Sequence, residues 1–309
     1  MLPTQRAALA QDQLVAAFLS GRSPQTLRAY RQDLEAFRVF TGAGSAAEAA
    51  RLLIAGGPAE ANTLALGWRN DLLERGLGPA TINRRLAALR SLVKLARLLG
   101  MASFTLEVEN LRVTPYRDTR GPGPDGFRLL MEAAGEASAK ALRDRAILRL
   151  LYDLALRRAE VVALNVSDVD FDLARLTILG KGRRQVEALT LPDPTRTALA
   201  AWLAARGPSP GPLFVNFDRA GKGRRLTGAG LYLIIQTLGR KVGLTVRPHG
   251  LRHAGITAAL DLTNGNLRAV QRYSRHKDPR ILAVYDDNRT DIAGEVARLV
   301  ASGGSVSPS

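Results

Sequence analysis

The sequence predicts a mainly α-helical protein of two domains, with a small β-sheet in the second domain. Its 309 residues exceed the usual domain size of about 100–200 residues. Apolar residues make up 46% of the chain, and they recur at three- and four-residue spacings, as in amphipathic helices. Alternating glycine and proline at 121–124 interrupt this pattern, which predicts a linker between the domains.

Four helices are expected within residues 10–110. The first begins at an N-cap serine, Ser23, followed by Pro24 at the first helical position, and it stops at Gly42. The other three are expected to begin at the capping-box serine Ser45, to run through Trp68 to Gly76, and to span 79–99. Together they predict a compact helical domain.

The last of these helices carries a polar face of Asn83, Arg90, Lys94 and Arg97, opposite its apolar face. Such a stripe either lies on DNA or faces solvent, and the spacing alone does not decide between the two.

The second domain, residues 127–300, is expected to combine helices with two short strands. The strands, at 175–179 and 186–191, flank Gly180-Lys181-Gly182, which fits a glycine turn. Helices are expected at 127–134, 141–156, 194–205, 227–241, 251–260 and 267–273. Residues 111–126 are predicted as a basic linker and 301–309 as a flexible tail.

Composition excludes several classes of chemistry. The chain has no cysteine, which rules out disulfides, cysteine-ligated zinc, iron–sulfur clusters and thiol catalysis. Its three histidines all lie within 249–276, so a dispersed histidine-rich metal site is not expected. No GxxxxGK[ST] or GxGxxG motif occurs, so neither a nucleotide nor any other cofactor is expected. The N-terminus lacks a signal-peptide pattern and no segment is apolar enough to span a membrane, which predicts a cytoplasmic protein.

The net charge of +16 predicts a polyanionic partner, and nucleic acid is the usual one because each neutralised phosphate releases counterions. A membrane surface is a weaker alternative. A GC-rich genome, which favours arginine in its proteins, would also produce such a charge.

The segment 248–253 has the pattern of an anion-binding site. If a helix starts near Gly250, His249 and Arg252 share one face at its N-terminal end. A phosphate there would meet backbone N–H groups, a forked guanidinium and an imidazole that can exchange a proton. A buried histidine beside a surface arginine is the alternative interpretation.

Four motifs occur in an order that resembles the tyrosine recombinase (phage integrase) family. They are Tyr152-Asp-Leu-Ala-Leu-Arg157-Arg-Ala-Glu160, Gly180-Lys181-Gly182, Pro248-His249-Gly-Leu-Arg252-His253, and His276 followed nine residues later by Tyr285. Two further stretches, Ser23-Pro-Gln-Thr-Leu-Arg-Ala-Tyr30 and 80–90, resemble the helical DNA-clamping domain of that family. The resemblance covers about residues 12 to 300 and is closest to the two-domain, Xer-like form.

This resemblance implies a SAM-like helical core-binding domain and a mixed α/β catalytic domain that together form a C-shaped clamp around double-stranded DNA. It implies a homotetramer, or an assembly with a related recombinase, on two DNA sites in the synaptic complex. It further implies six catalytic residues: Arg157, Lys181, His249, Arg252, His276 and Tyr285. DNA contacts are predicted for Arg28, Arg84, Arg90, Lys94, Arg97, Arg117 and Arg275.

The chemistry of strand cleavage accounts for each residue type. A tyrosine hydroxyl, with an ordinary pKa near ~10, needs a base such as His249 or a strongly positive site to attack phosphorus at neutral pH. Two arginines can hold the non-bridging oxygens as charge develops on them. Lys181 could protonate the leaving 5′ oxygen. The 3′-phosphotyrosyl product conserves the bond energy, so rejoining needs neither metal nor ATP.

Two departures from the family pattern bear on this assignment. Val186 and Glu187 stand where the family commonly has an arginine, which leaves the strand register open. Family members often have Leu-Gly before the histidine equivalent to His276, whereas this chain has Ser274-Arg275. The chemistry of a tyrosine nucleophile alone does not choose between Tyr285 and Tyr273. The spacing seen in the family selects Tyr285.

Two other functions are compatible with these residues. A type IB topoisomerase-like enzyme uses similar groups to cut and reseal one duplex, and a catalytically silent DNA-binding protein would use the same basic surfaces. A short amphipathic pattern at 292–300 predicts a C-terminal helix that docks either on its own domain or on a neighbouring protomer.

Overall fold

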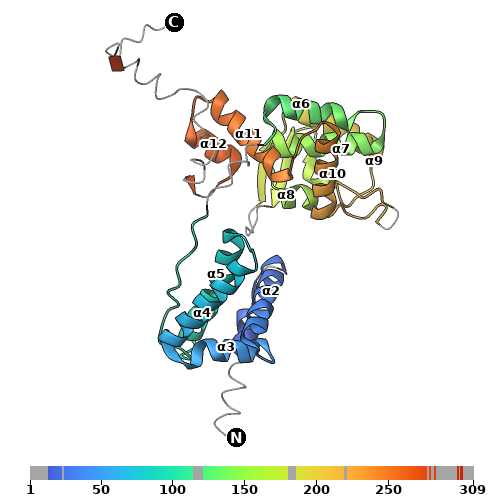
Figure 1. Cartoon of the computed structure of the whole chain (residues 1–309). Coiled ribbons are helices and arrows are strands. Elements are labelled where there is room, and N and C mark those ends of the chain that lie inside the picture. Colours follow the sequence, from blue (N-terminus) through green and yellow to red (C-terminus); the bar gives the residue numbers. More distant parts are fainter. Residues whose placement is uncertain are drawn as a thin grey trace. The chain divides into compact units, whose positions relative to one another are not determined.

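The computed structural model describes residues 13–22, 24–113, 121–179, 186–218, 221–276, 278–279, 282, 298 and 300–301. The chain divides into two compact units, Met1–Pro115 and Tyr116–Ser309 (Figure 1). This division falls inside the stretch that the sequence predicts as a linker. No helix among the described residues is both long enough and apolar enough to cross a membrane.

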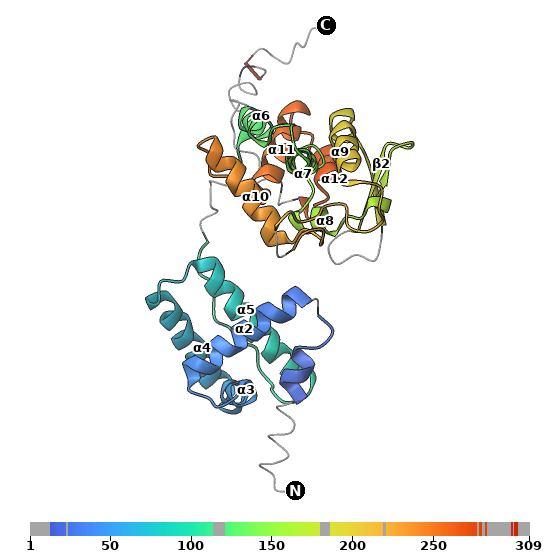
Figure 2. The ribbon, with the colours of Figure 1, turned by 90° about the vertical axis from the view of Figure 1, so that its right-hand side faces the viewer.

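The first unit is helical throughout its described elements, which are a helical stretch at 13–18, α2 (Pro24–Thr41), α3 (Ala46–Ala55), α4 (Gly57–Glu74) and α5 (Pro79–Leu98). α2 crosses α5 (Figure 2). The core is centred on Phe37 and the fully buried Trp68, whose rings meet edge to face at 5.0 Å. These four predicted helices are confirmed within a residue or two, because each has an apolar face and a proline or glycine at its boundary.

Ser45 caps α3 as its spacing predicts. Its hydroxyl accepts the Glu48 N–H at 3.1 Å, while the Glu48 carboxylate accepts the Gly44 N–H at 2.8 Å. The reciprocal bond therefore reaches one residue further back than in a standard capping box.

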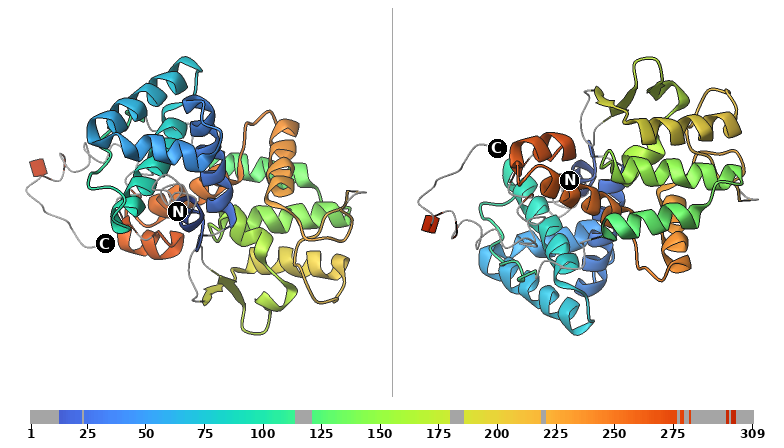
Figure 3. Two further views of the ribbon diagram at one scale, coloured as in Figure 1. Left: turned by 90° about the horizontal axis from the view of Figure 1, so that it is seen from below. Right: turned by 90° about the horizontal axis from the view of Figure 1, so that it is seen from above.

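The second unit has seven helices in its described part: α6 (Gly123–Ala134), α7 (Ala139–Tyr152), α8 (Arg158–Ala163), α9 (Asp193–Arg206), α10 (Gly228–Lys241), α11 (Pro248–Leu262) and α12 (Leu267–Ser274). α7 lies between α6 and α9 (Figure 3) and also packs against α8 and α11. Most of its residues are buried, including Ile147, Leu148 and Leu151. α7 is therefore the central element of this unit.

A three-stranded antiparallel sheet has the order β1 (Val169–Asp170), β2 (Arg175–Leu179) and β3 (Val186–Thr190). The register pairs Arg175 with Thr190 and Leu179 with Val186, which settles the question that the sequence left open. β2 and β3 were expected, whereas β1 and α8 were not, because segments of two and six residues are too short to show a periodic pattern.

Three predicted boundaries are wrong. α7 ends at Tyr152 and not at residue 156, and the Ala155 backbone beyond it, with φ 44°, is not helical. α6 begins at Gly123, inside the predicted linker, because Pro124 occupies the first turn, where a missing N–H leaves no hydrogen bond unmade. For the same reason α11 begins at Pro248, three residues before the expected range 251–260.

The crossing of α11 over the end of α7 requires a glycine. A Cβ on Gly255 would lie 2.2 Å from the Tyr152 carbonyl oxygen, so only hydrogen fits there. By contrast, a Cβ on Gly250 of the same helix would meet its nearest neighbour at an ordinary 3.5 Å.

We therefore expect Gly255→Ala to lower the free energy of unfolding by about 1–3 kcal/mol through overpacking. Gly250→Ala is the matched control, and it should be neutral or slightly stabilising because alanine favours helix. Urea denaturation of both variants measures the difference. Equal stabilities would contradict the close approach of the two helices.

Candidate active site

Arg252 is the buried centre of the candidate site. α11 carries it into the second unit, where it is 2% exposed. Its guanidinium donates to the Ala155 carbonyl, to the Ser274 carbonyl at 2.5 Å and to His276 Nε2 at 3.3 Å. One side chain thus joins the turn after α7 to the end of α12, segments separated by about a hundred residues.

Arg157 stands at the N-cap of α8 and is held by Glu160. The Arg157 backbone N–H donates to Glu160 Oε2 at 2.7 Å, and its Nη1 donates to Oε1 at 2.8 Å. Glu160 is buried, whereas the Arg157 side chain is 32% exposed. The carboxylate therefore fixes Arg157 from the inside and leaves part of its guanidinium accessible to a ligand.

Sequence reasoning assigned no role to Glu160. Its spacing three residues after an N-cap position was a signal, because this is where a capping-box glutamate stands. Burial, the largest single influence, raises its pKa, but the Arg157 N–H and the Arg275 and Arg157 guanidiniums outweigh it, so the pKa is lowered. Glu160 is thus an anion at neutral pH.

His276 is oriented by hydrogen bonds to both ring nitrogens. Nε2 faces the Arg252 guanidinium, which can only donate, so Nε2 accepts. Nδ1 then carries the proton and donates to the Ser274 hydroxyl at 3.1 Å. This assignment of the tautomer follows from the donor inventory of arginine.

Both site histidines have lowered pKa values. Burial lowers the pKa of His276 to about 4, with further contributions from Arg252 and Arg157. Partial desolvation of the imidazole, followed by Arg252 and Arg157, also lowers the pKa of His249. The residue still has enough accessible surface to meet a ligand. A neutral His249 can accept a proton, as a general base must.

The structure thus brings together four of the six predicted catalytic residues: Arg157, His249, Arg252 and His276. The other two, Lys181 and Tyr285, lie outside the described residues, as does Arg117. The described ends of β2 and β3 flank residues 180–185. Burial lowers the pKa of Arg275, and the carboxylates of Glu160 and of Glu187 in β3 partly oppose that shift. The base of this hairpin therefore lies near the site.

The prediction that Arg275 contacts DNA is wrong. Its side chain is 4% exposed and is bonded to Glu160 at 3.1 Å and to backbone carbonyls. Sequence alone could not show this, because an arginine in a basic chain is usually at the surface.

Tyr273 makes structural contacts that disfavour a role as nucleophile. Its hydroxyl donates to the Tyr152 carbonyl at 2.9 Å and to the Asp153 carbonyl at 3.1 Å. Burial, followed by Asp153, raises its pKa further above the ordinary value, which disfavours the phenolate. His253 is likewise buried, within 3.4 Å of the Thr257 hydroxyl, which confirms its predicted packing role.

The polar face of α5 divides into two parts. Asn83 exchanges two hydrogen bonds with the Leu111 backbone, and Arg90 donates to the Val108 carbonyl and to Asn110. These two residues hold the chain segment that follows α5, and the predicted DNA contact of Arg90, which is partly exposed, stays a prediction. Lys94 and Arg97 are exposed.

Two other predicted DNA contacts of the first unit are also accessible. Arg28 is exposed, and the Arg84 side chain is 44% exposed while it pairs with the buried Asp33.

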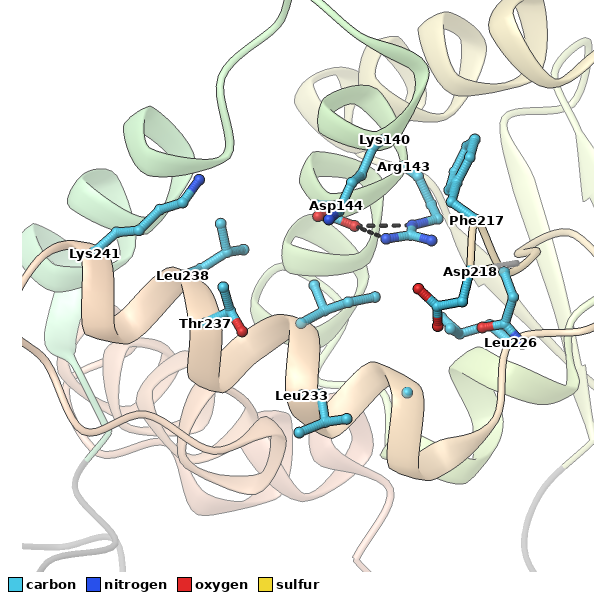
Figure 4. A pocket seen from close by; sticks show the side chains of 13 residues that line it. Lys140, Arg143, Asp144, Phe217, Asp218, Leu226, Leu233, Thr237, Leu238 and Lys241 are labelled. Atoms are coloured by element: carbon cyan, nitrogen blue, oxygen red, sulfur yellow. Dashed lines mark hydrogen bonds and ion pairs between the residues drawn. The ribbon is translucent and has the colours of Figure 1, made fainter. Parts of the chain in front are cut away.

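A separate cavity of about 280 Å³ lies between α7, α10 and the segment before α10 (Figure 4). Lys140 and Lys241 stand at its rim, and the buried Arg143–Asp144 pair faces it. None of the four predicted catalytic residues that the structure describes lines it, so it is separate from the place where those four meet.

Residues 124–291 match the phage integrase family. The chain is 39% identical over 305 residues to tyrosine recombinase slr0733 of Synechocystis sp., covering 97% of each chain. It is 42% identical over 287 residues to tyrosine recombinase Synpcc7942_B2651 of Synechococcus elongatus, covering 91% of this chain and 90% of that one.

Solved structures share the fold. The XerH site-specific recombinase bound to difH matches with a TM-score of 0.64 at 19% identity, over 88% of this chain and 80% of that one. The Tn1549 transposon integrase in complex with circular intermediate DNA matches with a TM-score of 0.65 at 16% identity, over 94% and 98%. The chain belongs to the phage integrase family, the tyrosine recombinases.

We expect His276 to titrate near pH 4 and His249 below 6.5 in the DNA-free protein, because burial and the neighbouring arginines disfavour their charged forms. Since the chain has three histidines, two-dimensional NMR resolves them, and His276→Gln and His249→Gln identify the signals. The unfolded chain binds the His276 proton near 6.5, so the stabilising contribution of His276 declines as the pH falls from 6.5 to 4. A His276 that titrates at or above 6.5 would contradict the burial.

Proposed function

We propose that this protein is a site-specific DNA recombinase in which Arg157, His249, Arg252 and His276 surround the scissile phosphate, with Tyr285 as nucleophile and Lys181 as general acid. The observation that carries this proposal is the convergence of those four side chains from α8, α11 and the end of α12. Family membership supports the two residues outside the described part of the chain.

Cleavage exchanges one phosphodiester for another. The Tyr285 oxygen bonds to phosphorus as its proton passes to His249, whose lowered pKa favours the neutral, accepting form. The bond from phosphorus to the 5′ oxygen breaks, and Lys181 protonates that oxygen. The products are a 3′-phosphotyrosyl bond and a free 5′ hydroxyl, and attack by a 5′ hydroxyl from a partner duplex completes the exchange.

Arg157 and Arg252 provide the charge that this reaction needs. The phosphate gains negative charge on its non-bridging oxygens in the pentacoordinate state, and a preorganised guanidinium stabilises that charge without reorganising. Both arginines are already fixed in the DNA-free protein, one by Glu160 and the other by two carbonyls.

The partner in this proposal is double-stranded DNA in the cytoplasm, enclosed by the two units as a clamp. Arg28, Arg84, Lys94 and Arg97 would contact the backbone from the first unit, and four protomers would assemble on two sites. The net charge of +16 supports binding to DNA, and the relatives are named as recombinases.

We expect Tyr285→Phe to abolish the covalent adduct that wild type forms, without added metal, on nicked duplexes from the DNA flanking the gene. The nick lets the short 5′ fragment diffuse away, so the adduct accumulates and a denaturing gel detects it. Tyr273→Phe is the matched control and should retain the adduct, because that hydroxyl only donates to two carbonyls.

Two outcomes of this gel, and one of a plasmid-relaxation and strand-joining assay done beside it, would change the assignment. An adduct with Tyr285→Phe would refute the nucleophile, and loss with Tyr273→Phe at unchanged stability would point to Tyr273. If wild type forms the adduct and relaxes plasmids but never joins strands of two duplexes, the activity is that of a topoisomerase.

We expect Arg157→Lys to slow single-turnover cleavage by about 10²–10³-fold, the usual effect of removing one transition-state donor. An ammonium keeps the charge but cannot fork onto both Glu160 and a phosphate oxygen. Arg158→Lys, at the exposed neighbouring position, is the control and should cleave like wild type. Equal rates for the two variants would argue against contact between Arg157 and the phosphate.

A further inference from the structure

Arg275 occupies an unusual position beneath the site. It ends α12 in the left-handed conformation, with φ 57° and ψ 36°, which is strained for a residue with a Cβ. Glycine is the residue that adopts this conformation freely. Arg275 therefore combines a strained backbone with a buried guanidinium. Each lowers the stability of the fold unless another interaction offsets it.

Most contacts of the Arg275 guanidinium lead to the turn that carries Arg157, and one further bond, from Nη1 to the Tyr273 carbonyl at 3.3 Å, stays at the end of α12. Its Nη1 donates to the Leu154 carbonyl and its Nη2 to the Ala155 carbonyl, each at 3.1 Å. Nη2 also pairs with Glu160 Oε2 at 3.1 Å. The Arg157 Nη2 in turn donates to the Arg275 carbonyl at 3.3 Å.

Glu160 is therefore shared by two arginines. Its Oε1 accepts from the Arg157 guanidinium, while its Oε2 accepts from the Arg157 N–H and from Arg275. With Arg157 as its sole guanidinium partner, this buried carboxylate would cancel the charge that the phosphate requires. With Arg275 present, the charges of Glu160 and Arg275 balance, and Arg157 and Arg252 keep two positive charges for the substrate.

We propose that Arg275 is a positioning residue for strand cleavage, which neutralises Glu160 and holds the 154–157 turn so that Arg157 faces the scissile phosphate at full charge. This inference rests on the proposed function above. It separates two tasks that a single Arg157–Glu160 pair would have to combine, namely fixing the guanidinium and stabilising the developing negative charge.

Single-turnover cleavage of nicked duplexes with a normal or an uncharged methylphosphonate scissile group tests this role. We expect Arg275→Met and Arg275→Gly to cleave the normal phosphate about 10–100-fold more slowly than wild type, the usual effect of losing a group that orients a reacting one. The loss should be at least tenfold smaller on the methylphosphonate, where one negative charge is absent, and the Kd for DNA should change little. Arg275→Lys should recover part of the rate.

Three comparisons separate this role from simple loss of structure. Arg272→Met removes the same charge from the exposed face of α12 and should cleave like wild type. Glycine adopts the left-handed backbone without strain, so we expect Arg275→Gly to fold even if Arg275→Met does not. In a Glu160→Gln background there is no carboxylate to balance, and the further change Arg275→Gly should cost less than about threefold.

The proposal is overturned if Arg275→Gly cleaves the normal phosphate like wild type, if its loss is the same on both substrates, or if it costs as much in the Glu160→Gln background. Each of these results leaves the recombinase assignment intact, provided that wild type forms the Tyr285-dependent adduct. A wild type without that adduct on any flanking duplex overturns the proposed function and this inference together.

Discussion

The close approach of α11 to the last turn of α7 determines where the site residues meet. Gly255 lets the two backbones come together at Tyr152, so that Arg252, one turn earlier on α11, reaches the Ala155 carbonyl. A small apolar cluster of Ala155, Ile256, Leu260, Val270 and Leu282 packs beside this contact. A larger side chain at the crossing would move Arg252 away from the turn that carries Arg157, and the site would separate into unrelated parts.

That contact also gathers an unusual amount of positive charge. Arg157, Arg252 and Arg275 lie close together around the buried carboxylate of Glu160, and burial, followed by Arg252 and Arg157, lowers the pKa values of His276 and His249. Such a cluster costs folding free energy when no anion is bound, because a buried charge without a partner is destabilising. An anion that arrives with the substrate supplies that partner, as expected for a phosphoryl-transfer site.

The first unit shows a different use of basic residues. On α5, Asn83 and Arg90 hold residues 108–111 against the helix, and Arg84 pairs with the buried Asp33 of α2. Lys94 and Arg97 of the same helix remain exposed. A basic stripe on one helix therefore serves both folding and surface charge, and its members can be told apart by their hydrogen-bond partners, not by their spacing.

Local information in the sequence was sufficient for most elements. Helices with an apolar face and a capping residue, such as α2 and α5, and the paired strands β2 and β3 were predictable because their signals lie within a few neighbouring residues. The ordered motifs along the chain also predicted that Arg157, His249, Arg252 and His276 would lie near one another, as they do in the structure. The tertiary structure decided what depends on residues far apart: the sheet register, the locked hydroxyl of Tyr273, the shared carboxylate of Glu160 and the burial of Arg275. The physical reason is that desolvation and pairing with distant carbonyls set the charge and role of a side chain, and neither is encoded in its immediate neighbours.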